Sequence, residues 1–167
     1  LGPAQVLVMV QQLALEIAQV HDVEVATLYG NDGSDYLVGG AGVDSMVGGS
    51  GNDYYYVDVA GDVTNETSTV TTEIDRVYSD ASRTLGANLE ELYLSGSANT
   101  SGYGNELANT IWGNSGANYL SGGEGNDTLI GGAGVDTLVG GTGSDHYYVD
   151  VSGDVTTETS TLATEID

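Results

Sequence analysis

Residues 122–148 read GGEGNDTLI-GGAGVDTLV-GGTGSDHYY, which is a nine-residue unit written three times in succession. The shared pattern is Gly-Gly-x-Gly-x-Asp-x-apolar-x. Further copies begin at Gly30, Gly39 and Gly48 and keep the same register. A fixed period repeated in tandem is typical of a solenoid, in which each unit stacks on its neighbours.

The array belongs to a larger duplication. Residues 28–75 align with residues 120–167, and 33 of the 48 aligned residues are identical, so the two segments are copies of one unit. Two looser nonapeptides, 104–112 and 113–121, precede the second array. In these copies Asn109 and Asn118 replace the Asp at the sixth place.

Each nonapeptide predicts a turn followed by a short strand. Glycine at the first, second and fourth places permits left-handed backbone and close approach to an ion. The last three residues favour a strand, and its middle side chain is expected to point inward: Leu37, Met46, Tyr55, Leu129, Leu138 and Tyr147. Two nonapeptides then make one flattened turn, and loops two repeats apart stack roughly 4.8 Å from each other. We therefore expect an all-β, right-handed parallel β-roll or β-helix.

The strict copies resemble the repeats-in-toxin (RTX) nonapeptide of secreted bacterial proteins, a calcium-binding parallel β-helix repeat. The segments 55–62 and 85–94 also resemble the spacers of very large proteins of this family. The resemblance implies several bound Ca²⁺ ions. It also implies a chain that stays unfolded in the low-calcium cytosol, leaves through a type I secretion channel and folds outside, secreted or at the cell surface.

We expect four segments along the chain. Residues 1–27 form an N-terminal cap, because Val6, Met9, Val10, Leu13, Ile17 and Val20 recur at the spacing of an amphipathic helix. A remnant of an upstream domain is the alternative for this stretch. Residues 28–62 form the first calcium-binding array, 63–94 an irregular β-coil spacer, and 95–167 a second array that is truncated at its C-terminal end.

The composition excludes several classes of partner. The 167 residues include 25 acidic side chains against two Arg and no Lys, a formal charge of -23, so nucleic acid and anionic membranes are repelled. There is no cysteine for a thiolate metal site or a thiol nucleophile. Since no apolar run approaches the roughly 20 residues that span a bilayer, membrane insertion is not expected.

Stacking brings the sixth-place aspartates into vertical pairs: Asp35 with Asp53, Asp44 with Asp62, Asp127 with Asp145, and Asp136 with Asp154. Two carboxylates about 5 Å apart repel by roughly 3 kcal/mol at an effective dielectric constant near 20. A divalent cation relieves this repulsion best. Calcium takes 6–8 oxygen ligands from carboxylates and carbonyl groups, whereas zinc prefers His or Cys.

The expected calcium-binding residues are these eight aspartates together with residues of the glycine loops. The loop residues are Gly30, Asn31, Asp32, Gly33, Gly39, Gly40, Gly42, Gly48, Gly49, Gly51, Asn118, Gly122, Gly123, Gly125, Gly131, Gly132, Gly134, Gly140, Gly141 and Gly143. Asn keeps a carbonyl oxygen but lacks the charge, so we expect a weak site at Asn118 with Asp136 and none at Asn109 on the side away from Asp127.

Other polar residues suggest no catalytic site, and the chain is not expected to be an enzyme. His21 and His146 are expected at the surface, Trp112 faces outward, and Arg76 and Arg83 pair with neighbouring acids. The Thr and Ser run 67–72 is a β-surface or a glycosylated patch.

The sequence thus predicts a calcium-binding structural or adhesin-type stalk, whose partners are calcium and the neighbouring repeats. Surface polysaccharide and other copies of the chain are further partners to consider. The alternatives are an accessory, carbohydrate-binding or secretion module of an extracellular enzyme whose catalytic domain lies elsewhere, and an ice-binding face. An even outward ladder of Thr, which an ice-binding face needs, is absent.

Overall fold

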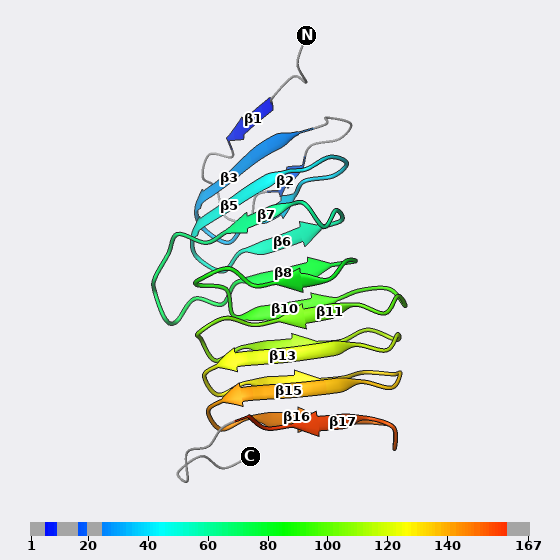
Figure 1. Ribbon diagram of the computed structural model, residues 1–167. Helices are drawn as coiled ribbons and strands as arrows, with labels where there is room; N and C mark the ends of the chain where they lie inside the picture. The colour runs from blue at the N-terminus through cyan, green and yellow to red at the C-terminus, as the bar shows by residue number, and fades with distance from the viewer. Residues whose placement is uncertain (1–5, 10–16, 20–24, 160–167) are drawn as a thin grey trace.

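The computed structural model describes residues 6–9, 17–19 and 25–159, which form an all-β parallel solenoid (Figure 1). Each turn contributes one strand to each of two faces, and the strands of each face pair in parallel with those of the next turn. The part of the chain that the structure describes contains no helix, and hence none able to cross a membrane.

One face is a continuous eight-stranded sheet in the order β16-β14-β12-β10-β8-β6-β4-β2. Its strands are β2 (Ile17–Gln19), β4 (Tyr36–Val38), β6 (Tyr54–Val57), β8 (Arg76–Ser79), β10 (Glu91–Leu94), β12 (Thr110–Trp112), β14 (Thr128–Ile130) and β16 (His146–Tyr148). This sheet runs unbroken from the first array through the spacer into the second array.

The other face consists of two sheets that follow one another along the solenoid. The first holds β1 (Val6–Met9), β3 (Ala26–Asp32), β5 (Ser45–Ser50) and β7 (Val63–Asn65). The second holds β9 (Arg83–Thr84), β11 (Ser101–Tyr103), β13 (Tyr119–Glu124), β15 (Thr137–Thr142) and β17 (Val155–Thr157). The Arg83 guanidinium bridges the break, since it donates to the backbone oxygen of Asp62 at 2.6 Å and to Thr64 Oγ1 at 2.8 Å.

The repeat length of the sequence sets the register of the turns. In the arrays each residue pairs with the one 18 positions later, as Tyr36 does with Tyr54. The spacer departs from this length, because Tyr54 pairs with Arg76 and Arg76 with Glu91. Loops of unequal length absorb the difference while the strands stay aligned.

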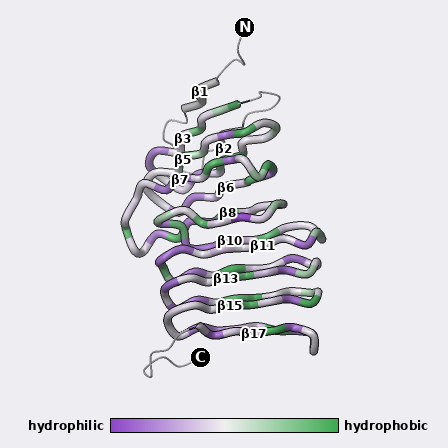
Figure 2. Tube along the Cα trace, in the orientation of Figure 1, coloured by the Kyte–Doolittle hydropathy of each residue, from purple (hydrophilic) through white to green (hydrophobic). Residues whose placement is uncertain are grey.

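The core is a narrow stack of the inward side chains from both faces. Leu37, Met46, Tyr55, Leu129 and Leu138 are fully buried, as the sequence predicts, and Tyr147 is partly buried against the same cluster. Val77 and Leu92 of the spacer and Ile111 of the first Asn repeat continue the stack. Figure 2 shows hydrophobic residues recurring in the strands of successive turns. With about one large side chain per nonapeptide, this core is small relative to the backbone that it must order.

An aromatic ladder covers the outer surface of the eight-stranded sheet. Tyr56, Tyr78, Tyr93 and Trp112 lie on adjacent strands, and their rings stack with centroids 4.1–5.0 Å apart and interplanar angles of 6–11°. Stacked rings on adjacent strands stabilise a sheet beyond their buried area.

The prediction of an N-terminal helix is wrong wherever the structure describes this segment. Val6–Met9 is strand β1, which pairs with β3, and Ile17–Gln19 is strand β2, which pairs with β4. Residues 10–16 and 20–24 of the predicted cap lie outside the described residues. The run Val6-Leu7-Val8-Met9 is also rich in strand-forming residues, and the unpaired edge of β3 supplies hydrogen-bond partners for its backbone.

Candidate metal centre

The sixth-place residues of the repeats line up in two columns, one along each edge of the solenoid. Each of them directly precedes a strand, so the register of the strands stacks them. The first column contains Asp35, Asp53, Asp75, Glu90, Asn109, Asp127 and Asp145. The second contains Asp44 and Asp62 and, beyond the break between β7 and β9, Thr100, Asn118, Asp136 and Asp154. The four aspartate pairs of the sequence are parts of these longer columns.

One carboxylate oxygen of each later aspartate is used by the backbone of the preceding turn. The amide of Asp35 donates to Asp53 Oδ1 at 2.8 Å, and the amide of Asp127 donates to Asp145 Oδ1 at 2.8 Å. The second column repeats this arrangement, with the amide of Asp44 donating to Asp62 at 3.0 Å. These bonds fix the side chains against the solenoid edge.

The other carboxylate oxygen is buried and has no protein partner. This holds for Oδ2 of Asp44, Asp53, Asp127 and Asp136. Each oxygen points at the first glycine of its own loop: a Cβ added to Gly39 would lie 2.7 Å from Asp44 Oδ2. Glycine is required there because a side chain would occupy the space beside the carboxylate. A buried charged oxygen without a partner is costly, so each of these positions calls for a cation or a proton.

The loop backbone supplies further oxygens. The second and fourth residues of all six strict repeats have positive φ, from 76° at Asn31 to 134° at Gly143. With this conformation the loops pack so closely that a Cβ at Gly49 or Gly141 would collide with the carbonyl oxygen of the loop one turn earlier. The gap between stacked loops is therefore lined by backbone carbonyl groups and carboxylates, the hard oxygen donors that calcium prefers.

Burial also changes the acidity of the column residues. It raises the pKa of both Asp53 and Asp127 to about 7, and the backbone hydrogen bond to each carboxylate offsets this only in part. Nearby carboxylates raise the pKa further. Glu66 and Asp35 act on Asp53, and Asp145 and Glu158 act on Asp127. Burial also raises the pKa of Asp44 and that of Asp136. A divalent ion would remove the cost of keeping these groups ionised.

The two Asn repeats have a different loop. No residue of 104–121 has positive φ, and the side chains of these repeats close the loop themselves. Asn109 Nδ2 donates to the Leu89 oxygen at 3.0 Å, and Asn109 Oδ1 accepts the amide of Asn105 at 2.7 Å. Asn118 Nδ2 donates to Thr100 in the same way. The side-chain oxygen of each Asn accepts a backbone amide of its own loop, at the position where the strict repeats have an aspartate.

Sequence reasoning missed the acids through which the spacer continues the first column. Asp75 is 2% exposed and accepts the amide of Asp53 at 2.6 Å, while its own amide donates to Glu90 Oε2 at 2.9 Å. The available signal was the pattern Asp-x-apolar-x in Asp75-Arg76-Val77-Tyr78, which matches the end of a nonapeptide without its glycines.

The remaining predicted residues take simpler positions. Asn31 and Asp32 are exposed at the C-terminal end of β3, and His146 is exposed on β16. The Arg76 guanidinium pairs with Glu91 at 2.8 Å, and Arg83 binds the spacer as described above. His21 lies outside the described residues.

Comparison with known families agrees with this geometry. Residues 27–58, 103–138 and 112–147 match a family model described as the RTX calcium-binding nonapeptide repeat, which holds four copies of the unit. The matches cover the strict repeats and the two Asn repeats. No curated protein and no solved structure matches the chain significantly.

Proposed function

We propose that this chain, whose repeats match the RTX calcium-binding nonapeptide model, is a structural module of a secreted or cell-surface protein that folds when it binds calcium outside the cell. The eight sixth-place aspartates and the loop carbonyl groups of the strict repeats would hold the ions. Calcium supplies positive charge that joins consecutive turns, and the chain supplies a ready stack of oxygens.

The observation that carries the proposal is the set of buried carboxylate oxygens without partners in both columns. The chain has a formal charge of -23 and only two cationic residues besides its two His. Arg76 pairs with Glu91, and Arg83 donates to the backbone oxygen of Asp62 and to Thr64, so neither guanidinium makes an ion pair with a column aspartate. Protons or metal ions must therefore neutralise the columns, and at neutral pH and extracellular calcium levels the metal is available.

The negative charge of the chain also favours an unfolded state before export. Without calcium the aspartates of the strict repeats repel one another, and the small core offers little to oppose that repulsion. A cytosolic chain would stay extended, as passage through a secretion channel requires. Extracellular calcium modules bind at about 10⁻⁴–10⁻³ M, a range that separates the two compartments.

We favour a stiff spacer or adhesin-type stalk over a carbohydrate-binding module. Sugars bind aromatic residues through the faces of the rings. In the ladder of Tyr56, Tyr78, Tyr93 and Trp112 the two inner rings, Tyr78 and Tyr93, have both faces covered by neighbouring rings, which leaves few ring faces for a sugar. A catalytic domain elsewhere in the parent protein is compatible with this role.

Circular dichroism during a calcium titration tests the proposal. We expect a cooperative gain of β-structure with a midpoint near 10⁻⁴–10⁻³ M, on the order of extracellular calcium modules. Magnesium at the same concentration should not replace calcium, since it demands tight octahedral geometry. A chain equally folded in excess chelator at neutral pH would refute the proposal.

A further inference from the structure

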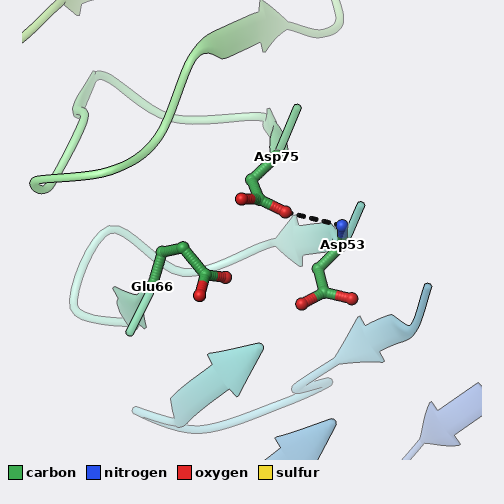
Figure 3. Close-up of side chains that lie close together, drawn as sticks. All are labelled: Asp53, Glu66 and Asp75. Atoms are coloured by element: carbon green, nitrogen blue, oxygen red, sulfur yellow. Dashed lines mark hydrogen bonds between the residues drawn. The ribbon is translucent and has the colours of Figure 1, made fainter. Parts of the chain in front are cut away.

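A cluster of three buried acids lies where the first array meets the spacer. Asp53 precedes β6, Asp75 precedes β8 on the next turn, and Glu66 follows β7 on the opposite sheet. Their exposed fractions are 0%, 2% and 4%. One carboxylate oxygen from each lies within 4.8 Å of the other two, and Figure 3 shows the three carboxyl groups around one space. Glu66 lies outside the nonapeptides, so it is no part of their pattern.

The protein holds Glu66 firmly in this position. Its Oε1 accepts the amides of Thr67 at 2.6 Å and Ser68 at 2.7 Å, and its Oε2 accepts the hydroxyl of Tyr55 at 2.8 Å. The same hydroxyl accepts the amide of Gly48 at 2.9 Å. The carboxylate is thus preorganised beside the first glycine of the loop that carries Asp53.

The second oxygen of Asp53 points into the same space and has no partner. Asp53 Oδ2 is fully buried and makes no hydrogen bond. A Cβ at Gly48 would collide with Asp53 Oδ2 and would lie 2.5 Å from Glu66 Oε2, so the two oxygens flank one point. Neither Arg neutralises the cluster: Arg76 pairs with Glu91, and Arg83 binds Asp62 and Thr64. Three buried carboxylates with one unsatisfied oxygen and no cation indicate a missing positive ion.

We propose that Asp53, Glu66 and Asp75 form a three-carboxylate calcium site that joins the first array to the spacer. It rests on the proposed function, because it uses the same ion. It differs from the sites between glycine loops, since one ligand comes from the β7–β8 connection. Three carboxylates with no His or Cys favour calcium over zinc. The ion would tie residues 66–75 to the array and let the irregular turn follow the regular ones.

The second array repeats the arrangement as far as the structure describes it. Tyr147 donates to Glu158 Oε2 at 3.0 Å and accepts the amide of Gly140 at 3.0 Å, as Tyr55 does with Glu66 and Gly48. The duplication places Asp167 where the first copy has Asp75, although Asp167 lies outside the described residues. Two copies of the sequence thus build the same Tyr and Glu contact beside a sixth-place aspartate.

An ion can reach the cluster from solvent. Asp75 and Glu90 line an open pocket together with Ser68, Val70 and Asn88. The pocket therefore brings solvent to the Asp75 side of the cluster.

The test compares Glu66→Gln and Asp75→Asn with Glu106→Gln in the whole chain. Glu106 is exposed in an Asn repeat, so its variant makes the same charge change outside any cluster. Calcium bound at equilibrium is counted by dialysis and mass spectrometry, and thermal unfolding is followed by circular dichroism in chelator and in calcium. Gln keeps one oxygen for the Thr67 and Ser68 amides, and the Tyr55 hydroxyl, which loses its carboxylate acceptor, still has the backbone oxygen of Asn65 at 3.2 Å.

We expect both cluster variants to bind one calcium fewer, or to bind it at least about tenfold more weakly, with Glu106→Gln unchanged. The cluster variants should unfold at a higher temperature than the parent in chelator, because repulsion is reduced, and at a lower one in calcium. A purely structural Glu66 would destabilise both states alike. Equal calcium number and affinity in all variants would overturn this site alone, whereas a parent chain that binds no calcium would overturn the proposed function.

Discussion

Replacing Gly141 by Ala tests how closely the stacked loops must approach. Gly141 is the second residue of its repeat, with φ at +116°, and an added Cβ would collide with the carbonyl oxygen of Gly123 one turn earlier. The two loops would have to separate before an ordinary contact is restored. Gly96 serves as the control, because its φ is +77° but an added Cβ meets nothing within 4 Å.

The magnitude follows from two contributions. Holding a residue other than glycine at positive φ costs about 1–2 kcal/mol, and both variants share this cost. Separating the loops at Gly141 also weakens the pairing of β13 with β15 at Gly123 and Glu124, and the bond from the Gly125 amide to the Thr142 oxygen at 2.9 Å. At about 1 kcal/mol for each lost hydrogen bond, the extra cost is about 2–3 kcal/mol.

Thermal unfolding in saturating calcium, followed by circular dichroism, measures the difference. One kcal/mol shifts the midpoint by about 2–4 °C in a chain of this size. We therefore expect Gly141→Ala to lower the midpoint by roughly 10 °C and Gly96→Ala by roughly 4 °C. Equal losses in the two variants would refute the close packing of the loops and the lining of carbonyl groups inferred from it.

Three further predictions concern the columns. The pKa values of Asp53 and Asp127 are raised to about 7 from about 3.9 in the unfolded chain. The free energy of unfolding without calcium should therefore fall as the pH rises from about 4 to about 7. Circular dichroism in chelator measures this, and no gain of structure in acid would contradict it. Asp127→Asn should raise the calcium midpoint roughly tenfold, while His146→Ala, at an exposed position, should leave it unchanged; equal shifts would show that the register is wrong. Asn109→Asp removes the donor to the Leu89 oxygen and should cost about 1–3 kcal/mol in urea unfolding with calcium; an unchanged midpoint would contradict an amide-closed loop.

The strict period made the repeat geometry predictable. A nine-residue unit fixes both the alternation that buries Leu37 and Leu129 and the 18-residue register that stacks Asp35 on Asp53. The same register also placed Asn109 in the column of sixth-place residues, so its different role could be predicted from the sequence.

The spacer and the N-terminal segment were harder to predict. Asp75 joins the column 22 residues after Asp53 and Glu90 only 15 residues later, so counting in nines does not reach them. Glu66 enters the cluster through a connection that carries no repeat. At Val6–Met9, an apolar spacing compatible with a helix was decided by the edge of a neighbouring sheet, a tertiary effect that local pattern does not contain.

Anomalous scattering from crystals grown in calcium would show whether the ions lie between stacked aspartate loops, because it locates each ion relative to the loops. We expect strong peaks between the loops of Asp35 and Asp53 and between those of Asp127 and Asp145. We expect no peak beside Asn109 on the side away from Asp127. Peaks in the loops of 95–112, with none at 48–53 and 140–145, would contradict these expectations.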